Sequence, residues 1–467
     1  MDRRVVVTGT GWVTPLGADV PGVWQKMLAG ESAIGPITRF DASSYATNFG
    51  GQVNDFDLAN FFEPAFCRAH ADAGVGTQFA LAAAAQAWQQ AGLGPSAAYG
   101  RVDPMRVGMY LGAGEGSLDY ENFMAANLAG WDATSRSVDA NAWATVAYEK
   151  MAAGIELEQE PHAVLPHLAA AFGCRGPAYN CMTACAASTQ AIGEAFEMIR
   201  RGDADVMLAG GAHSMLHTLG MTGFIRLTAM STRRDDPLHA SRPFDKTRDG
   251  FVMGEGAGII VLEALDHFLN RIRTQPEHKT DAAKSPTKPT VLAEIAGYGS
   301  TADAYRITDM HPDGMGPANA IRVALAGAGI NPAEPRQQAD GSSRPPVDYI
   351  SAHGTSTKEN DSIETKAIKD AFGDQAKSIA VSSIKAMTGH LIQAAGAVEF
   401  ITCVQAIQTG TLPPTVNLHA PDDGLDLDYI PNQFRDMRDS GGVEVCLSNS
   451  FGFGGQNDSV VVKRFMP

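Results

Sequence analysis

Several features are missing from this sequence, and each absence excludes a class of protein. There is no run of about 18 apolar residues, so we expect no membrane-spanning helix. Met1-Asp-Arg-Arg4 leads directly into an apolar strand instead of a signal peptide, which predicts a cytoplasmic protein. Basic residues are in deficit, 36 against 52 acidic ones, and the formal charge of −16 argues against nucleic acid as a partner.

The chain also lacks the paired C-x-x-C spacing of zinc and thioredoxin-like sites. Its cysteines are scattered, and we interpret them as reduced thiols of which one or two take part in chemistry. They are Cys67, Cys174, Cys181, Cys185, Cys403 and Cys446. The glycine-rich turn after the first apolar stretch does not have the G-x-G-x-x-G spacing of a dinucleotide site. We therefore expect neither a metal nor a nucleotide cofactor.

What the sequence does have is length and a regular alternation of elements. At 467 residues the chain exceeds the size at which a single core stops growing, which predicts two domains or two fused halves. Short apolar runs alternate with helical segments, which is typical of an α/β architecture with mostly parallel strand pairing. Residues 118–161 have weak periodicity, and we interpret the acidic cluster at residues 156–160 as a solvated face.

One stretch interrupts this alternation. Residues 273–290 are rich in Pro, Lys and Thr and have little to bury, so we predict an exposed linker or loop there. After it the order of strands and helices begins again. This predicts an N-terminal half over residues 1–272 and a C-terminal half over residues 291–467. We expect the same fold in both halves, although they share no repeat at the level of single residues.

Cys185 is the first candidate for chemistry. It stands after small apolar residues, where a helix rich in Ala and Ile begins. The first turn of a helix has unpaired N–H groups and a partial positive charge, which favour a thiolate and offer donors to an oxyanion. A free cysteine also packs like a small hydrophobe, so an inert buried thiol is the alternative for this stretch taken alone.

Three stretches of the C-terminal half place further polar groups at strand ends, where α/β proteins carry reactive groups. His353 and His390 are able to donate hydrogen bonds to developing negative charge or to relay a proton. Lys385, five residues before His390, needs a carboxylate partner, and Glu399 is the nearest candidate. The third stretch, residues 449–455, is a glycine-rich loop.

The chain resembles the elongating β-ketoacyl-acyl carrier protein synthases of the I/II type in four motifs that occur in the family's order. They are Thr183-Ala-Cys185-Ala, His353-Gly-Thr-Ser-Thr357, Lys385-Ala-Met-Thr-Gly-His390 and Asn449-Ser-Phe-Gly-Phe-Gly-Gly455. Residues 241–258 also resemble that family, and the resemblance covers nearly the whole chain. It implies a thiolase-like fold, in which two similar α/β halves stack in five layers, α-β-α-β-α, and it implies a homodimer.

The resemblance also implies that Cys185 and the two histidines converge on one pocket, and it implies the reaction. Cys185 would take an acyl group from an acyl carrier protein as a thioester. His353 and His390 would assist the decarboxylation of malonyl-acyl carrier protein, and the resulting enolate would attack the thioester to give 3-oxoacyl-acyl carrier protein. Such a site needs hydrogen-bond donors and no strong acid, a requirement that two neutral histidines meet.

Supporting roles follow from the same resemblance. Backbone N–H groups of Cys185 and Phe453 would form the oxyanion hole, and Phe453 would also gate the acyl pocket. Lys385 and Glu399 would support the histidines electrostatically. The residues expected to bind substrate are Thr355 and Thr357, which would hydrogen-bond the pantetheine arm, together with Asp303, Gly452, Gly454 and Gly455.

Some positions depart from the family pattern. Gln456 stands where threonine is more common, and Arg306 stands where histidine is expected. Residues 118–161, 276–289 and 335–346 are longer than expected, which leaves the accepted acyl chain open and favours specialised lipid or polyketide assembly over primary fatty acid synthesis. An acidic carrier protein needs local positive charge for docking. We expect contributions from Arg68, Arg226, Arg233 and Arg234.

Two other functions fit parts of the pattern. One is a non-catalytic, chain-length-factor-like partner in a synthase heterodimer, and the retained Cys185 and histidines argue against it. The other is a thiolase, which acts on coenzyme A thioesters and would need a second catalytic cysteine in the C-terminal half. Cys403 and Cys446 fall within a predicted helix and a predicted strand, which disfavours that role.

Overall fold

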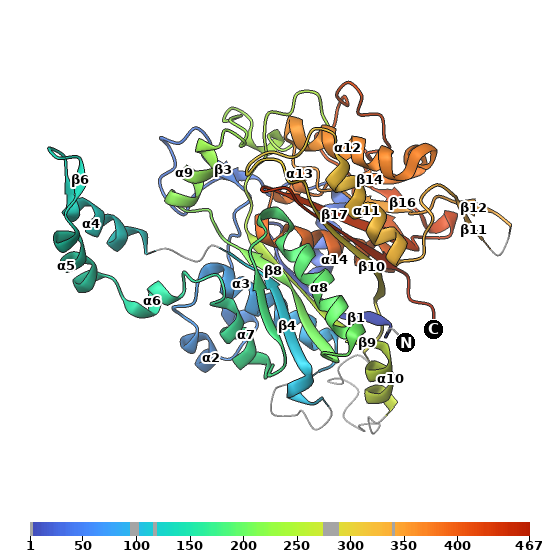
Figure 1. Cartoon of the computed structure of the whole chain (residues 1–467), viewed down its shortest axis with the longest axis horizontal. Helices are drawn as coiled ribbons and strands as arrows, with labels where there is room; N and C mark the ends of the chain where they lie inside the picture. Colours follow the sequence, from blue (N-terminus) through green and yellow to red (C-terminus); the bar gives the residue numbers. More distant parts are fainter. Residues whose placement is uncertain (1–2, 94–101, 115–118, 274–288, 339–340) are drawn as a thin grey trace.

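The computed structural model describes residues 3–93, 102–114, 119–273, 289–338 and 341–467. Ten strands form its main sheet (Figure 1). Those of the first half are β1 (Val5–Val13), β4 (Val107–Gly112), β7 (Ala178–Cys181), β8 (Val206–His213) and β9 (Gly256–Ala264). Those of the second half are β10 (Ala293–Ala302), β13 (Tyr349–Ser351), β14 (Ala380–Ser382), β17 (Val445–Gly452) and β18 (Gln456–Lys463). They lie in the order β14-β13-β17-β18-β10-β1-β9-β8-β4-β7.

The two groups of five strands have the same topology. When the strands are numbered by chain order within each group, both groups are arranged 3-2-4-5-1. In both, the 1-5 and 4-5 pairs are antiparallel and the 2-4 and 2-3 pairs are parallel. This arrangement confirms a duplicated fold. The expectation of mostly parallel pairing was wrong, because a tight connection such as the turn from Gly452 to Gln456 reverses the chain and permits only an antiparallel pair.

Helices fill the space between the two groups of strands and cover their outer faces. In the middle, α8 (Ala187–Arg201) contacts β4, β8, β10 and β18, and α14 (Ala395–Thr409) contacts β9 and β17. On the first half, α3 (Val75–Gln90) packs on β1 and β9, with α7 (Val164–Phe172) beside it. On the second half, α11 (Met315–Gly327) packs on β10 and β18, next to α12 (Lys358–Phe372). The structure therefore has the five layers that the resemblance implies.

Small residues allow the middle layer to pack tightly. A Cβ atom added at Gly396 of α14 would overlap the hydroxyl of Thr189 on α8, and one added at Gly193 would overlap the ring of Tyr298. Nearly every residue of α14 is buried, as expected for a helix enclosed between two sheets. β1 and β10 then join the two halves through a short antiparallel pairing of residues 5–7 with residues 293–295.

The remaining elements lie around this stack. The helices are α1 (Val20–Ala29), α2 (Pro64–Ala69), α9 (Thr218–Arg226), α10 (Leu265–Arg273) and α13 (Lys385–Thr388). The small strand pairs are β2 (Gly35–Pro36) with β3 (Phe49–Gly50), β11 (Arg336–Gln337) with β12 (Ser343–Arg344), and β15 (Thr411–Leu412) with β16 (Arg435–Asp436). In the described ranges, every helix is too short or too polar to cross a bilayer. Most of the predicted linker, residues 274–288, lies outside the described residues, so the division at 273–290 stays a prediction.

A helical arm projects from the first half (Figure 1). It consists of α4 (Tyr120–Gly130), the hairpin β5 (Trp131–Asp132) and β6 (Ser137–Val138), α5 (Ala140–Lys150) and α6 (Ala153–Leu157). The weak periodicity of this region hid these helices, because a helix that does not pack on the core needs no sharply apolar face. The expectation of a solvated acidic face was wrong for Glu158, which is half-buried and bonds His167 Nε2 at 2.8 Å.

Candidate active site

Cys185 lies in a strained turn between β7 and α8. It is in the middle of a single 3-10 turn, η4 (Ala184–Ala186), and α8 begins two residues later, so a helix does start where the sequence predicts it. Ala184 has a φ of 47°, a left-handed conformation that costs energy for a residue with a side chain. The turn places the Cys185 sulfur on the wall of a pocket of about 720 Å³.

The thiol form of Cys185 dominates in the resting pocket. Burial raises the pKa of the thiol to about 12, and the weaker effects of Lys385 and of the Phe453 N–H act in the opposite direction. The expectation that the helix end favours a thiolate was therefore wrong for the resting state. Removing the sulfur from water destabilises the anion by more than Lys385 and the backbone N–H groups of Phe453 and Cys185 stabilise it.

The glycine-rich loop after β17 closes over this turn. A Cβ atom added at Gly452 would lie 3.1 Å from Thr183 O and 3.2 Å from Cys185 N, so any side chain here would force the two backbones slightly apart. The backbone N–H groups of Phe453 and of Cys185 itself both face the sulfur, since both lower the pKa of the thiol. These are the two donors that an oxyanion hole requires beside a thioester.

The structure brings the two predicted histidines to the same pocket. One nitrogen of His353, one nitrogen of His390 and the Cys185 sulfur all lie within 4.8 Å of one another. The imidazole centroids are 5.3 Å apart, with the rings nearly perpendicular. His353 follows β13 and His390 follows α13, so a sulfur from the first half meets two imidazoles from the second half.

Hydrogen bonds assign the tautomer of both histidines. Lys385 Nζ lies 3.4 Å from His353 Nδ1, and the Ile392 N–H donates to His390 Nδ1 at 3.3 Å. Because each Nδ1 accepts, each Nε2 carries the hydrogen. Burial, followed by the charge of Lys385, lowers the pKa of both histidines well below the usual value. The pocket therefore presents neutral Nε2–H donors.

Lys385 is held by three acceptors. Its Nζ donates to His353 O at 2.5 Å and to Glu399 Oε1, and it faces His353 Nδ1. Three acceptors match the three N–H bonds of an ammonium group. Burial raises the pKa of Glu399, and the ammonium beside it opposes that shift. The predicted pairing of Lys385 with Glu399 is present in the structure.

Glu364 of α12 is a residue that the sequence did not single out. Its carboxylate accepts from the backbone N–H groups of His353 at 2.8 Å and Gly354 at 2.7 Å, which fixes the loop that carries His353. Burial raises the pKa of Glu364 to about 7, and these two N–H groups oppose the shift. A signal was available, because Glu364 stands beside Ile363 and three residues before Ala367, on the apolar side of a predicted helix.

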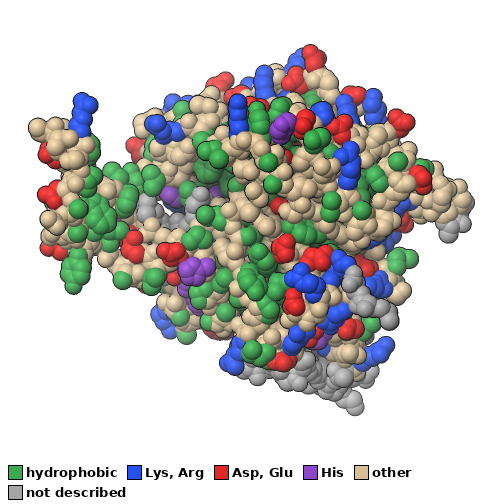
Figure 2. Space-filling model, in the orientation of Figure 1, with side chains coloured by type: hydrophobic (Ala, Val, Ile, Leu, Met, Phe, Trp, Pro, Cys, Tyr) green, Lys and Arg blue, Asp and Glu red, His purple; other side chains and the backbone are tan. Residues whose placement is uncertain are grey.

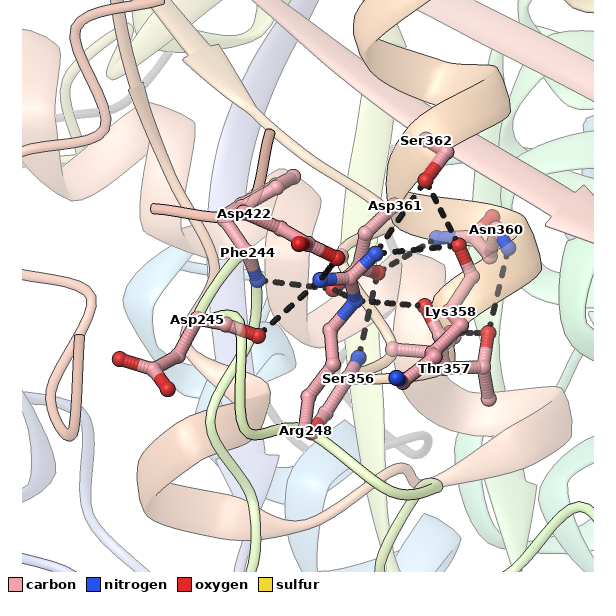
Figure 3. A network of polar contacts seen from close by, with 12 residues as sticks. Phe244, Asp245, Arg248, Ser356, Thr357, Lys358, Asn360, Asp361, Ser362 and Asp422 are labelled. Atoms are coloured by element: carbon pink, nitrogen blue, oxygen red, sulfur yellow. Dashed lines mark hydrogen bonds and ion pairs between the residues drawn. The ribbon is translucent and has the colours of Figure 1, made fainter. Parts of the chain in front are cut away.

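A second buried network, also missed from sequence, supports the same loop (Figure 3). The side chain of Arg248 is fully buried and donates to the carbonyl oxygens of Thr357 at 3.1 Å and Lys358 at 3.1 Å, and to Asp422 at 2.8 Å. Asp361 accepts from the backbone N–H groups of Phe244 and Ser356. The network ties residues 241–250 and residue 422 to the start of α12.

The predicted pantetheine contacts lie on this supported loop. The hydroxyls of Thr355 and Thr357 are 2.9 Å apart and both residues line the pocket. Thr357 also caps α12, because its hydroxyl accepts from the Asn360 N–H. Ser356 between them has a φ of 72°, and the bond from its N–H to Asp361 helps to hold that conformation.

Three predicted substrate-binding residues stand away from the pocket wall. Asp303 links two loops, since its carboxylate accepts from the His311 N–H and from Asn457, and its own N–H donates to Gly455 O. Gly454 and Gly455 form the turn between β17 and β18, with φ values of 82° and 72°. Contact of these three residues with substrate stays a prediction, whereas Gly452 does line the pocket.

The arginines expected to dock a carrier protein are spread unevenly. Arg226 adjoins Leu227 on the rim of the pocket, and Arg233 donates to Thr247 O on the same rim. Arg234 donates to Ser43 O, and Arg68 lies on α2, outside the set of pocket-lining residues. Two exposed lysines that sequence reasoning missed, Lys246 and Lys358, also stand on the rim.

A second hollow adjoins the catalytic pocket. It has a volume of about 560 Å³ and shares Leu227 with the pocket. Its walls are mainly apolar and include Met182, Met215, Leu219 and Phe224. Met215 and Phe224 pack in the same apolar cluster as Cys185. We refer to it as the apolar groove.

Among the described residues, Cys185 is the only cysteine that lines the catalytic pocket; Cys403 and Cys446 are fully buried between α14 and β17.

One cysteine and two histidines are also a possible zinc ligand set. The tautomers oppose that use, because an Nε2 that carries a hydrogen has no lone pair for a metal. The donors on both Nδ1 atoms disfavour the other tautomer.

The pocket holds a thiol that can take an acyl group and two imidazoles that can stabilise an enolate. Carbon–carbon bond formation between two thioesters requires both. The fold and the pocket thus define a condensing enzyme of thiolase-like architecture. Residues 2–267 match the family described as Beta-ketoacyl synthase, N-terminal domain, and residues 292–419 match Beta-ketoacyl synthase, C-terminal domain. The chain belongs to the β-ketoacyl synthase family.

Individual relatives agree with this assignment. The 3-oxoacyl-acyl-carrier-protein synthase 2 of Coxiella burnetii is 40% identical over 464 residues, which cover 99% of both chains. The chloroplastic 3-oxoacyl-acyl-carrier-protein synthase I of Hordeum vulgare is 36% identical over 470 residues, 100% of this chain and 90% of the relative.

Solved structures agree as well. A ketosynthase in complex with its type II polyketide acyl-carrier protein superposes with a TM-score of 0.80 at 31% identity over 100% of both chains. A β-ketoacyl synthase of Burkholderia phymatum also gives a TM-score of 0.80, at 28% identity over 99% of this chain and 100% of the other.

Proposed function

We propose that this chain condenses an acyl group held on Cys185 with malonyl-acyl carrier protein, giving 3-oxoacyl-acyl carrier protein and carbon dioxide. The observation that carries the proposal is that the Cys185 sulfur meets the imidazoles of His353 and His390 in one pocket. The sulfur and one ring nitrogen of each histidine lie within 4.8 Å of one another. Membership of the β-ketoacyl synthase family supports the same reaction.

The first step is acyl transfer to the sulfur. The Cys185 thiol attacks the acyl thioester, its proton leaves with the carrier's thiol, and the acyl group remains on Cys185. The thioester oxygen becomes negative during the attack, and the backbone N–H groups of Cys185 and Phe453 stabilise it. The acyl chain enters the apolar groove, whose wall includes Met215 and Phe224.

The second step is decarboxylation. The carbonyl oxygen of the malonyl thioester accepts from the Nε2–H groups of His353 and His390, loss of carbon dioxide leaves an enolate, and the enolate carbon attacks the acyl thioester on Cys185. Neutral imidazoles suit this step, because they stabilise the enolate oxygen without supplying an acidic proton to its carbon. The Cys185 sulfur leaves as a thiolate and takes up a proton from water, which regenerates the thiol.

Thr355, Thr357 and the rim residues would guide the carrier's pantetheine arm. The pocket reaches from Cys185 to a rim that carries Lys246 and Lys358, and Arg226 and Arg233 are beside it. Asp249, Asp309 and Glu359 also line the pocket, so an acidic carrier protein would contact the individual lysines and arginines of this rim rather than a uniformly positive face. We expect the double variant Arg226→Glu with Lys246→Glu to raise the KM for the carrier substrate with little change in kcat.

We propose a homodimer as the assembly. β7 is at the open edge of the ten-stranded sheet, and its Tyr179 and the adjoining Met182 are 52% and 57% exposed. An open edge strand with exposed large side chains favours pairing with another strand. The arm also exposes large apolar side chains, visible on the projecting part of Figure 2. They are Leu128, Trp131, Val138, Tyr148 and Leu157.

Sedimentation tests the assembly. The wild type should sediment as a dimer, and the double variant Tyr179→Asp with Met182→Asp should sediment as a monomer, whereas a monomeric wild type would refute the proposal.

The cytoplasmic location stays a prediction. The choice between fatty acid and specialised lipid or polyketide assembly also stays open, and turnover of a panel of acyl primers of different length and shape would settle it.

The two alternatives lack support from the pocket. A chain-length-factor-like subunit has no need of a thiol beside two inward-facing N–H groups, which Cys185 has here. A thiolase needs a second reactive cysteine, and Cys403 and Cys446 are buried away from the pocket. Activity with malonyl-acyl carrier protein by this chain alone supports the proposal. Activity only with acetyl-coenzyme A, or only in a heterodimer, would replace it.

A further inference from the structure

His213 is a buried histidine outside the catalytic set. It stands at the end of β8, is almost wholly buried, and its Nδ1 is hydrogen-bonded to Gln393 Oε1. Because the amide oxygen of Gln393 accepts, the hydrogen is on His213 Nδ1. Burial lowers the pKa of His213 to about 3, so the ring is neutral and adds no positive charge near His390.

Gln393 belongs to the turn that follows His390. The turn is η7 (Ile392–Ala394), a single 3-10 turn that leads into α14. Its first residue, Ile392, has a φ of 44°. A β-branched side chain in the left-handed region is a strained conformation, which persists only when its surroundings hold it. The strained turn directs the Ile392 N–H at His390 Nδ1.

The turn is anchored at two points, one before it and one within it. Before it, the His390 N–H donates to Val252 O at 2.7 Å and the Gly254 N–H donates to His390 O at 2.9 Å. Within it, the side chain of Gln393 is tied to His213 on β8. The backbone bonds fix residue 390, whereas the bond from His213 reaches the turn itself. His213 therefore holds the part of the chain that supplies the donor to His390 Nδ1.

We propose that His213 is a positioning residue for His390: by binding Gln393 it holds the strained turn at Ile392, and the Ile392 N–H in turn keeps the hydrogen of His390 on Nε2, toward the substrate. This inference rests on the proposed function. It assigns His213 to the decarboxylation step, in which His390 Nε2–H acts. Acyl transfer to Cys185 uses the backbone donors of Cys185 and Phe453 and does not need the tautomer of His390.

The experiment separates the two half-reactions. His213→Leu removes the donor to Gln393 at similar size, and decarboxylation of malonyl-acyl carrier protein should fall about 10- to 100-fold, as expected for a displaced catalytic donor. Acylation of Cys185, followed by mass spectrometry, should stay within about twofold of wild type. His213→Asn places an amide N–H near the former Nδ1 and should restore decarboxylation to within about threefold of wild type. The exposed His419 provides the matched control, His419→Leu.

A second variant keeps the test decisive if His213→Leu folds poorly. Gln393→Met removes the acceptor at similar shape and should show the same selective loss of decarboxylation. The double variant His213→Leu with Gln393→Met should be no slower than the slower single variant, because both substitutions remove the same hydrogen bond. Unchanged decarboxylation in both single variants, an equal loss of acylation and decarboxylation, or failure of His213→Asn to rescue would each overturn the inference. Absence of condensation by the wild type would instead contradict the proposed function.

Discussion

Lys385 holds His353 at two points: its Nζ donates to the backbone oxygen of His353 at 2.5 Å and lies 3.4 Å from the Nδ1 of the same residue. One ammonium group therefore fixes both the position and the tautomer of the imidazole. Glu399 accepts from the third N–H of the ammonium, so the charge of Lys385 is paired inside the protein.

Replacement of Lys385 should affect activity and stability separately. Lys385→Met removes the donor to His353 Nδ1, and the rate of malonyl decarboxylation should fall about 100-fold or more. It also leaves Glu399 buried and unpaired, which should lower the free energy of unfolding by about 3–5 kcal/mol. The double variant Lys385→Met with Glu399→Gln should regain most of the stability and none of the decarboxylation.

Urea unfolding and release of labelled carbon dioxide measure the two effects. The exposed pair of Lys377 with Asp426 supplies the control, since Lys377→Met should change neither quantity appreciably. Recovery of decarboxylation by the double variant would show that Lys385 serves only the packing of Glu399.

Gly452 should be needed for acyl transfer. In Gly452→Ala the new Cβ would lie 3.1–3.3 Å from Thr183 O, Cys185 N and Ala186 N, so the loop must move away from the nucleophile. The N–H of Phe453 would move with it, and loss of one oxyanion donor costs about 100- to 1,000-fold in kcat. Quenched time courses of Cys185 acylation with acyl-acyl carrier protein measure this loss. Gly35→Ala, where a Cβ meets no neighbour, is the control; wild-type acylation by Gly452→Ala would contradict the assigned oxyanion hole.

Asp458 predicts how stability depends on pH. This buried residue of β18 accepts from the Tyr298 hydroxyl at 2.7 Å, and burial raises its pKa to about 7. Its unfolded pKa is about 4, so between about pH 4 and pH 7 the folded chain binds a proton that the unfolded chain has lost. The stability contributed by this proton is complete below pH 4, falls as pH rises to about 7, and is absent above it.

Asp458→Asn removes this dependence, because an amide does not ionise. We compare the free energy of unfolding of the variant with that of wild type at each pH. The variant minus wild-type difference should be larger at pH 8 than at pH 4 by on the order of 4 kcal/mol. Urea titrations at the two pH values measure it, with the exposed Asp374→Asn as control. A difference between variant and wild type that is the same at both pH values would contradict the raised pKa.

The reacting groups could be predicted from sequence because they lie in short motifs at the ends of apolar runs. Cys185, His353, Lys385 and His390 each follow a recognisable strand or precede a recognisable helix, and local sequence specifies those boundaries. The pairing of Lys385 with Glu399 followed from a simple requirement, that a buried ammonium needs a carboxylate.

What could not be predicted depends on contacts between distant segments. Arg248 and Asp422 are 174 residues apart, and His213 and Gln393 are 180 residues apart, so no local pattern relates them. The raised pKa of Cys185 follows from the burial of its sulfur, which is a property of the assembled pocket. The strand directions likewise follow from the connections between strands rather than from the apolar runs themselves.

Mass spectrometry of acylated enzyme tests the central claim, that the sulfur and the imidazoles perform separate steps in one pocket. After incubation with acyl- and malonyl-acyl carrier protein, the double variant His353→Asn with His390→Asn should retain the acyl adduct on Cys185 and form no 3-oxoacyl product. Wild type should pass the adduct on to product, and Cys185→Ala should form neither adduct nor product. An adduct on any other residue, or condensation by Cys185→Ala or by the double histidine variant, would contradict the account.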